Sequence, residues 1–171
     1  SLTKPLITAL LVLEALDQGE FSLDTTVDQF FPDFPHKINI RQLLIHSSGL
    51  PAWHPFYLFN NSIQSQLNSL PLHARPGRKV IYSCVGYILL AKILESIHQV
   101  SFREIGHSRV IDRIGLEDSY IGVVPDLKRQ RCAPTETGNQ FEKQMALGKT
   151  QYREAAEKHR WRTELIYGEP N

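Results

Sequence analysis

The sequence has little cysteine and no long apolar run. Its two cysteines, Cys84 and Cys132, form no CxxC pair and are not accompanied by histidines at metal-ligand spacing. The sequence therefore predicts neither a metal site nor a disulfide framework, although a single disulfide between the two stays open. The longest apolar run, Leu6–Leu13, is interrupted by Thr8 and is far shorter than the roughly 20 residues that span a membrane. We interpret it as part of a core helix.

The sequence also lacks an excess of charge of either sign. It contains 19 Lys and Arg residues against 18 Asp and Glu residues, a formal net charge of +1. No block of like charges is long enough to form a nucleic-acid-binding arm, and the basic stretch Lys128–Arg131 is better explained as a solvated turn. We therefore expect no nucleic-acid partner. What the sequence does have is 42% hydrophobic residues in a chain of 171, which is typical of one ordinary globular domain with a real core.

Apolar spacing and capping residues predict four helices. Residues with the three-and-four spacing of an amphipathic helix run from Thr3 to Gly19, from Ser83 to His98 and from Phe102 to Ile114. Asn39 is expected to cap a shorter helix that ends at Gly49. These assignments give the chain a mainly helical core.

The remaining segments are predicted to be less regular. Phe21–Pro35 is expected to form a loop with one helical turn, and Pro51–Leu72 a long, aromatic-rich connection of the kind that often borders a binding site. Ser119–Val124 has the character of a strand. Gln140–Arg162, rich in Lys, Glu and Ala, is predicted to be a solvated helix or partly disordered.

The first four residues form a Ser-x-x-Lys pattern, Ser1-Leu2-Thr3-Lys4, at the head of the first helix. Side chains three positions apart on a helix lie on one face, about 5–6 Å apart at their Cβ atoms. The lysine amine can then hold or accept the proton of a serine nucleophile, and the helix N-terminus favours a developing oxyanion. This spacing is common by chance, so the pattern needs support from elsewhere in the chain.

That support comes from a second motif, Tyr82-Ser83-Cys84-Val85-Gly86-Tyr87, which follows the turn Arg75-Pro76-Gly77. With these motifs in this order, the chain resembles the class C β-lactamase and penicillin-binding-protein group of serine hydrolases. The blocks that carry the resemblance are Ser1–Pro5, Ile40–Pro51, Arg75–Gly77, Tyr82–Tyr87 and Ile114–Ser119.

The resemblance implies that Ser1 attacks a carbonyl carbon to form an acyl-enzyme, with Lys4 between Ser1 and Tyr82. Tyr82 would move the proton between nucleophile and leaving group, since a phenol beside a cation can give up its proton near neutral pH. The alternative for Tyr82 is a buried core tyrosine. Trp53 and Cys84 are candidate substrate-binding residues. The substrate would be a small molecule or a peptide-like ester, amide or β-lactam, with no metal or organic cofactor.

Two departures from the family pattern limit this interpretation. Cys84 stands where the family usually carries Asn, and a thiol lacks the donor and acceptor pair with which an amide holds a substrate amide. No Lys-Thr-Gly or His-x-Gly strand follows Val124. We therefore expect residues 1–171 to be a single partial domain, truncated at both ends. Its fold would be the mainly helical part of the α+β β-lactamase/transpeptidase-like architecture.

Two other functions stay open. A non-catalytic module of the same fold would bind its ligand, such as a cell-wall peptide, without turnover, and Cys84 favours it. In an N-terminal-nucleophile hydrolase, the α-amine of Ser1 would itself be the base. The resemblance alone implies a periplasmic, extracellular or membrane-associated location, and the sequence leaves the oligomeric state open.

Overall fold

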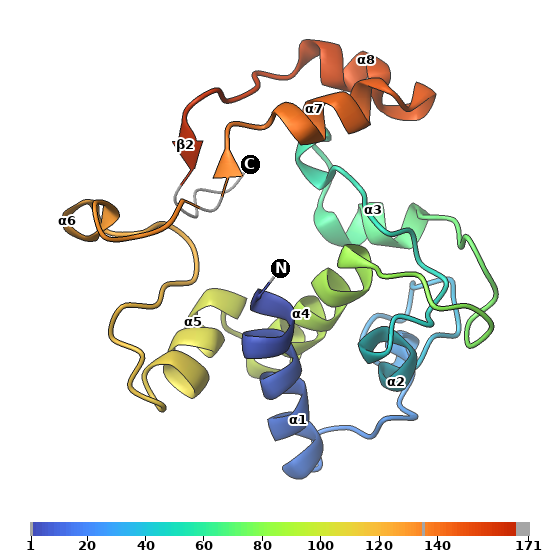
Figure 1. The fold of residues 1–171 in the computed structure, drawn as a ribbon. Helices are drawn as coiled ribbons and strands as arrows, with labels where there is room; N and C mark the ends of the chain where they lie inside the picture. Colours follow the sequence, from blue (N-terminus) through green and yellow to red (C-terminus); the bar gives the residue numbers. More distant parts are fainter. Residues whose placement is uncertain (1, 135, 167–171) are drawn as a thin grey trace. The chain divides into compact units, whose positions relative to one another are not determined.

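The computed structural model describes residues 2–134 and 136–166 of the chain (Figure 1). The described elements, in chain order, are a π-helical turn η1 (Lys4–Thr8), α1 (Ala9–Asp17), the 3₁₀ turn η2 (Val27–Gln29), α2 (Ile40–Leu44), the 3₁₀ turn η3 (Phe56–Leu58), α3 (Ile63–Ser69), α4 (Cys84–His98), α5 (Phe102–Gly106), the π-helical turn η4 (His107–Ile111), α6 (Asp126–Arg129), β1 (Glu136–Thr137), α7 (Gln140–Leu147), α8 (Thr150–Lys158) and β2 (Leu165–Ile166). Within these described ranges, no helix is both long and apolar enough to cross a lipid bilayer.

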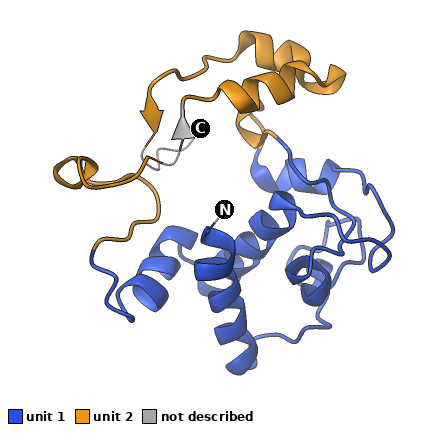
Figure 2. Ribbon diagram, viewed as in Figure 1, with its two compact units in different colours: residues 1–54, 62–117 blue, residues 55–61, 118–171 orange. Residues whose placement is uncertain are grey.

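The chain divides into two compact units (Figure 2). The first contains residues 1–54 and 62–117, and the second contains residues 55–61 and 118–171. Helices α1 to α5 lie in the first unit, and helices α6 to α8 and strands β1 and β2 lie in the second.

Helix α4 is the centre of the first unit, where it contacts α1, α2 and α5 (Figure 1). Its inner side chains Leu89, Leu90, Ile93 and Leu94 are essentially inaccessible to solvent. Burying each such side chain contributes about 1.5–3 kcal/mol, so this helix supplies much of the packing energy of the unit. It ends at His98 because the next residue, Gln99, adopts a left-handed conformation with φ of 57°.

The predicted N-terminal helix is confirmed, with an unexpected first turn. Residues Lys4–Thr8 are π-helical and continue directly into α1, and Gly19 reverses the chain with φ of +72°. Pro5 fits at this position because it falls within the first turn, where backbone N–H groups have no helical acceptor. The turn buries Lys4, which is 8% exposed.

The short helix α2 starts as predicted but ends differently. Asn39 caps it in a capping box, in which the Gln42 N–H donates to Asn39 Oδ1 (2.9 Å) and the Asn39 N–H donates to Gln42 Oε1 (3.1 Å). The predicted stop at Gly49 is wrong, because the helix ends at Leu44 and His46 takes the left-handed conformation with φ of 58°. Gly49, with φ of +80°, instead lies so close to the backbone of Ala74 that a Cβ atom would be 2.0 Å from the Ala74 carbonyl oxygen.

Two further predictions are wrong. The connection Pro51–Leu72 contains the helix α3, capped by Ser62, which escaped notice because only two of its side chains are buried. The predicted strand Ser119–Val124 is not formed: residues 121–123 form a bend, and neither of the two strands in the described ranges falls in this segment. The strands that the structure describes are β1 and β2, which pair antiparallel.

The second unit contains the two helices of the C-terminal region. The segment 140–162, expected to be a solvated helix or partly disordered, contains two helices, α7 and α8, separated at Gly148 and Lys149. These helices contact each other, and each buries one small side chain, Ala146 in α7 and Ala156 in α8, while their other residues are exposed or half-buried. This burial agrees with the few large apolar positions of the segment in the sequence.

Candidate active site

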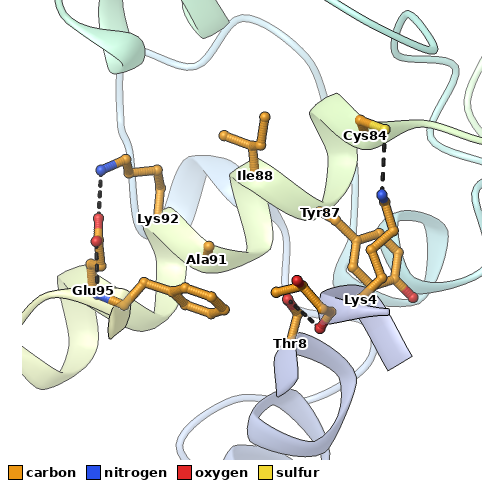
Figure 3. Close-up of a pocket in the computed structure, with 10 residues that line it drawn as sticks. Lys4, Thr8, Cys84, Tyr87, Ile88, Ala91, Lys92 and Glu95 are labelled. Carbon is orange, nitrogen blue, oxygen red and sulfur yellow. Dashed lines mark hydrogen bonds and ion pairs between the residues drawn. The ribbon is translucent and has the colours of Figure 1, made fainter. Parts of the chain in front are cut away.

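The side chain of Lys4 is the centre of the candidate site in the first unit. Its Nζ atom lies 3.3 Å from Cys84 Sγ and 5.1 Å from the ring centroid of Tyr82. A second aromatic ring, that of Tyr87, has its centroid 5.9 Å from the same nitrogen. Figure 3 shows Lys4 pointing toward Cys84 beside Tyr87. Aromatic faces attract a cation, so the two rings help to stabilise a largely buried ammonium group.

Helix α4 positions Cys84 and the loop before it through Ser83. The Ser83 hydroxyl accepts a hydrogen bond from the Gly86 N–H (3.0 Å) and donates one to the Pro51 carbonyl oxygen (2.6 Å). The backbone N–H of Cys84 donates to the carbonyl oxygen of Ala52 (2.8 Å). Cys84 is thereby fixed as the first residue of a 15-residue helix, at the end where the helix dipole is positive.

His46 holds the loop that carries Tyr82. Its carbonyl oxygen accepts from the Ile81 N–H (2.8 Å), and its Nδ1 accepts from the Ser83 N–H (3.1 Å). Its ring lies 4.5 Å from that of Tyr82 between centroids. Burial, and then the positive charge of Lys4, lower the pKa of His46 below its ordinary value of 6.5. The imidazole is therefore neutral at neutral pH, as an Nδ1 acceptor requires.

The two tyrosines beside Lys4 differ in what their hydroxyl groups do. The Tyr87 hydroxyl donates to the Leu44 carbonyl oxygen (3.1 Å), and burial, only partly opposed by the charge of Lys4, raises the pKa of Tyr87. Tyr87 is thus a protonated structural donor. Tyr82 is 55% exposed, so it is not the buried core tyrosine considered as the alternative. Of the two phenols, Tyr82 is the one available to a substrate.

A pocket of about 450 Å³ opens beside Lys4 within the first unit (Figure 3). It is lined by Thr3, Lys4, Thr8, Cys84, Tyr87, Ile88, Ala91, Lys92, Glu95 and Phe102. The Lys92–Glu95 ion pair lies at the end of the pocket away from Cys84 (Figure 3), and Glu95 also accepts from the Phe102 N–H (2.9 Å). The surface that lines the rest of the pocket is mostly apolar, and the Lys4 ammonium and the Cys84 thiol lie at one end.

The predicted site residues are only partly brought together. Lys4, Tyr82 and Cys84 converge, although 78 to 80 residues separate the first from the other two along the chain. Ser1 lies outside the described residues. Trp53 follows Ala52, whose carbonyl anchors Cys84, but it does not line this pocket. The loop-holding role of His46 was missed, since nothing in its own sequence block indicates contact with Tyr82.

The metal-ligating residue types do not gather in the described part of the chain. Among residues 2–134 and 136–166, no group of three or more His, Cys, Asp or Glu side chains is placed to hold a metal ion. Cys84 and Cys132 are both free thiols. The described side chains that meet at Lys4 carry an ammonium, a thiol and two phenols.

Comparison with known proteins identifies the family. A family model described as Beta-lactamase matches residues 1–156, and the chain belongs to this family. Penicillin-binding protein 4* of Bacillus subtilis is 28% identical over 133 residues, a match that covers 71% of this chain and 29% of that protein. A protein of Escherichia coli provisionally named a D-alanyl-D-alanine carboxypeptidase is 27% identical over 155 residues, or 78% of this chain and 36% of that one.

Solved structures show the same fold. A class C β-lactamase superimposes with a TM-score of 0.68 at 24% identity, over 78% of this chain and 38% of that one. A penicillin-binding protein from Bacillus halodurans gives a TM-score of 0.59 at 24% identity, over 70% of this chain and 43% of the other. The predicted family and the β-lactamase/transpeptidase-like fold, here mostly helical, are confirmed. The chain spans only about a third of the length of the curated relatives that it matches.

Proposed function

We propose that this chain carries the nucleophile side of a serine hydrolase site, in which Ser1 forms an acyl-enzyme and Lys4 and Tyr82 handle the proton. The observation that carries the proposal is the position of the Lys4 ammonium, 5.1 Å from the ring centroid of the exposed Tyr82. Tyr87, the other phenol near this cation, is occupied by the Leu44 carbonyl. Family membership supports a hydrolase, since its members include penicillin-binding proteins and class C β-lactamases.

The proposed reaction assigns one step to each group. The Ser1 hydroxyl attacks the substrate carbonyl carbon as its proton passes to the Tyr82 oxygen, which the neighbouring Lys4 cation stabilises in its anionic form. Tyr82 then gives this proton to the leaving oxygen or nitrogen as the carbonyl–leaving-group bond breaks. Water hydrolyses the ester on Ser1 and restores the serine. Positive potential at the start of the helix favours the oxyanion in both steps.

The substrate class follows from the groups around the cation. Cys84 offers a sulfur rather than an amide beside the site, so it cannot hold both ends of a substrate amide. We therefore place an ester, or a peptide-like amide or β-lactam bound through other groups, in the site, with Trp53 as a candidate for its border. A periplasmic, extracellular or membrane-associated location is part of the same proposal.

The test is covalent labelling of the protein that contains this chain. Incubation with a fluorophosphonate or a labelled penicillin, followed by intact mass, is expected to add one group, on Ser1, and none in Ser1→Ala. Tyr82→Phe is expected to slow labelling by about 10²–10⁴-fold, the usual contribution of a general base. The matched variant Tyr87→Phe is expected to slow it by less than about 10-fold, because its hydroxyl binds the backbone.

A second function, binding without turnover, is favoured by the hydrogen bond from Lys4 to Cys84, which engages the cation with a group that the family does not usually carry there. Reversible binding of the penicillin with no mass increase in any variant would support this module and refute the hydrolase. Labelling that persists when extra residues precede Ser1 would refute an N-terminal-nucleophile mechanism.

A further inference from the structure

The contact between Lys4 and Cys84 brings together two groups that can form a covalent bond once the sulfur has been oxidised. Their Nζ and Sγ atoms are 3.3 Å apart, and both side chains line the 450 Å³ pocket, which a small molecule can enter. The other cysteine of the chain, Cys132, donates from its Sγ to the neighbouring Ala133 carbonyl oxygen (3.4 Å), and no hydrogen bond joins it to a lysine among residues 2–134 and 136–166. The two thiols thus provide a matched pair in one molecule.

The surroundings of Cys84 place two sources of positive potential beside its sulfur. An ammonium group that donates to a sulfur stabilises negative charge on that sulfur, and the positive end of a helix dipole acts in the same direction. Cys84 has both, because Lys4 contacts its Sγ and it is the first residue of the 15-residue α4. The thiolate is the form that peroxides oxidise to a sulfenic acid.

We propose that Cys84 is a peroxide-sensitive modification site that becomes covalently joined to Lys4. In the first step, the thiolate attacks one oxygen of hydrogen peroxide, the O–O bond breaks, and a sulfenic acid and, after protonation, water are formed. In the second step, the Lys4 amine, after loss of one proton, attacks this sulfur, and the S–O bond breaks with release of a second water. The product is a sulfenamide with an S–N bond. A thiol or phosphine reductant cleaves this bond and restores both side chains.

The bond would change the site because it consumes the cation beside Tyr82. A sulfenamide nitrogen carries no positive charge, so the stabilisation of a Tyr82 phenolate would be lost while the bond exists. This effect on hydrolysis rests on the proposed function of Lys4 and Tyr82. Formation of the bond does not, since it depends only on the positions of the two atoms.

The experiment treats the intact protein with hydrogen peroxide and maps its tryptic peptides by mass. Lys4 lies in the peptide that ends at Lys37, because trypsin does not cut before Pro5, and Cys84 lies in the peptide 80–92. We expect a linked pair of these peptides, two hydrogen atoms lighter than their sum, which a phosphine separates. Cys84 is expected to be consumed at least ~10-fold faster than Cys132.

Two variants complete the test. Lys4→Arg keeps a cation but lacks a reactive amine, so a dimedone-type reagent should trap the sulfenic acid at position 84 and no linked peptides should form. Cys84→Ser should show neither product, and Cys132→Ser should behave as the unmodified protein. Equal consumption of the two thiols in the unmodified protein, or a Cys84 sulfenic acid that never joins Lys4, would overturn the proposal. Because the readout is mass, linked peptides in a protein that never labels on Ser1 would support this inference and count only against the hydrolase.

Discussion

Replacement of Ser83 by Ala tests how the start of α4 is held in place. The Ser83 hydroxyl makes two hydrogen bonds, one from the Gly86 N–H and one to the Pro51 carbonyl oxygen, and the residue is only 1% exposed. Loss of an N-cap typically costs about 1 kcal/mol, and loss of a hydrogen bond to a buried polar group costs about 1–3 kcal/mol. Since water cannot easily reach this position, we expect Ser83→Ala to lower the free energy of unfolding by about 2–4 kcal/mol.

Ser101 provides the matched control for this substitution. Its hydroxyl caps α5 by accepting from the Glu104 N–H (3.3 Å), but the residue is exposed, and the Ser101 hydroxyl and N–H both donate to the Glu104 carboxylate. Ser101→Ala therefore removes a cap without leaving a buried carbonyl, and we expect a loss of only about 1 kcal/mol.

The assay is urea unfolding of both variants followed by far-UV circular dichroism. We expect the Ser83 variant to have the lower midpoint at an unchanged slope, because the substitution alters a local pair of bonds rather than the surface exposed on unfolding. A free energy of unfolding for Ser83→Ala equal to that of Ser101→Ala would refute the reasoning, since the buried bond to Pro51 would then contribute nothing measurable.

Two further substitutions test the backbone and the charge of the site. Gly49→Ala is expected to lower the free energy of unfolding by more than the roughly 1–2 kcal/mol of a left-handed alanine, because its Cβ would lie 2.0 Å from the Ala74 carbonyl oxygen. Gly19→Ala, also left-handed but with open space around its Cβ, should lower it by only that amount. Equal unfolding free energies for the two variants would contradict this account. The pKa of His46 is lowered in the folded protein, so near this pKa the unfolded chain binds more protons than the folded one. The contribution of His46 to stability is therefore complete above its ordinary pKa of 6.5 and is lost as the pH falls toward the pKa of the folded state. His46→Asn, which tolerates the left-handed conformation, is therefore expected to lose less stability between about pH 7 and pH 5 in urea unfolding than the unmodified protein, and identical pH dependence would rule out His46 as the source.

Local capping explains which parts of the fold could be predicted from the sequence. Asn39 and Ser83 act on N–H groups three residues away, so their helices were located correctly at the N-terminal end. The end of α2 could not be predicted, because the left-handed conformation falls on His46, and histidine adopts it less readily than glycine does. Gly49, three positions later, is the more typical residue for a helix stop. Helix α3 was missed because it buries Gln66 and Leu67 rather than an apolar stripe.

The site shows a similar division between local and long-range information. The resemblance of two short motifs was enough to predict that Lys4 and Tyr82 share one site, and the structure brings their side chains together. The role of His46 could not be predicted, because its three contacts to the 81–83 loop depend on how α2 packs against α4. Trp53 is a candidate substrate-binding residue because it lies in an aromatic-rich loop, but the pocket beside Lys4 is lined mainly by α4 and the first helical turn.

The replacement of an amide by a thiol at position 84 changes more than substrate contact. An ammonium has three N–H donors, so the bond from Lys4 to the Cys84 sulfur leaves the cation able to act on other groups. An amide oxygen at this position would bind the same cation without being open to oxidation, whereas a sulfur adds a second reaction to the same pocket. The geometry that places a cation beside Tyr82 for the proposed acyl transfer therefore also places an amine within reach of an oxidised sulfur. The two proposed reactions would share one atom, Lys4 Nζ, and only one of them could use it at a time.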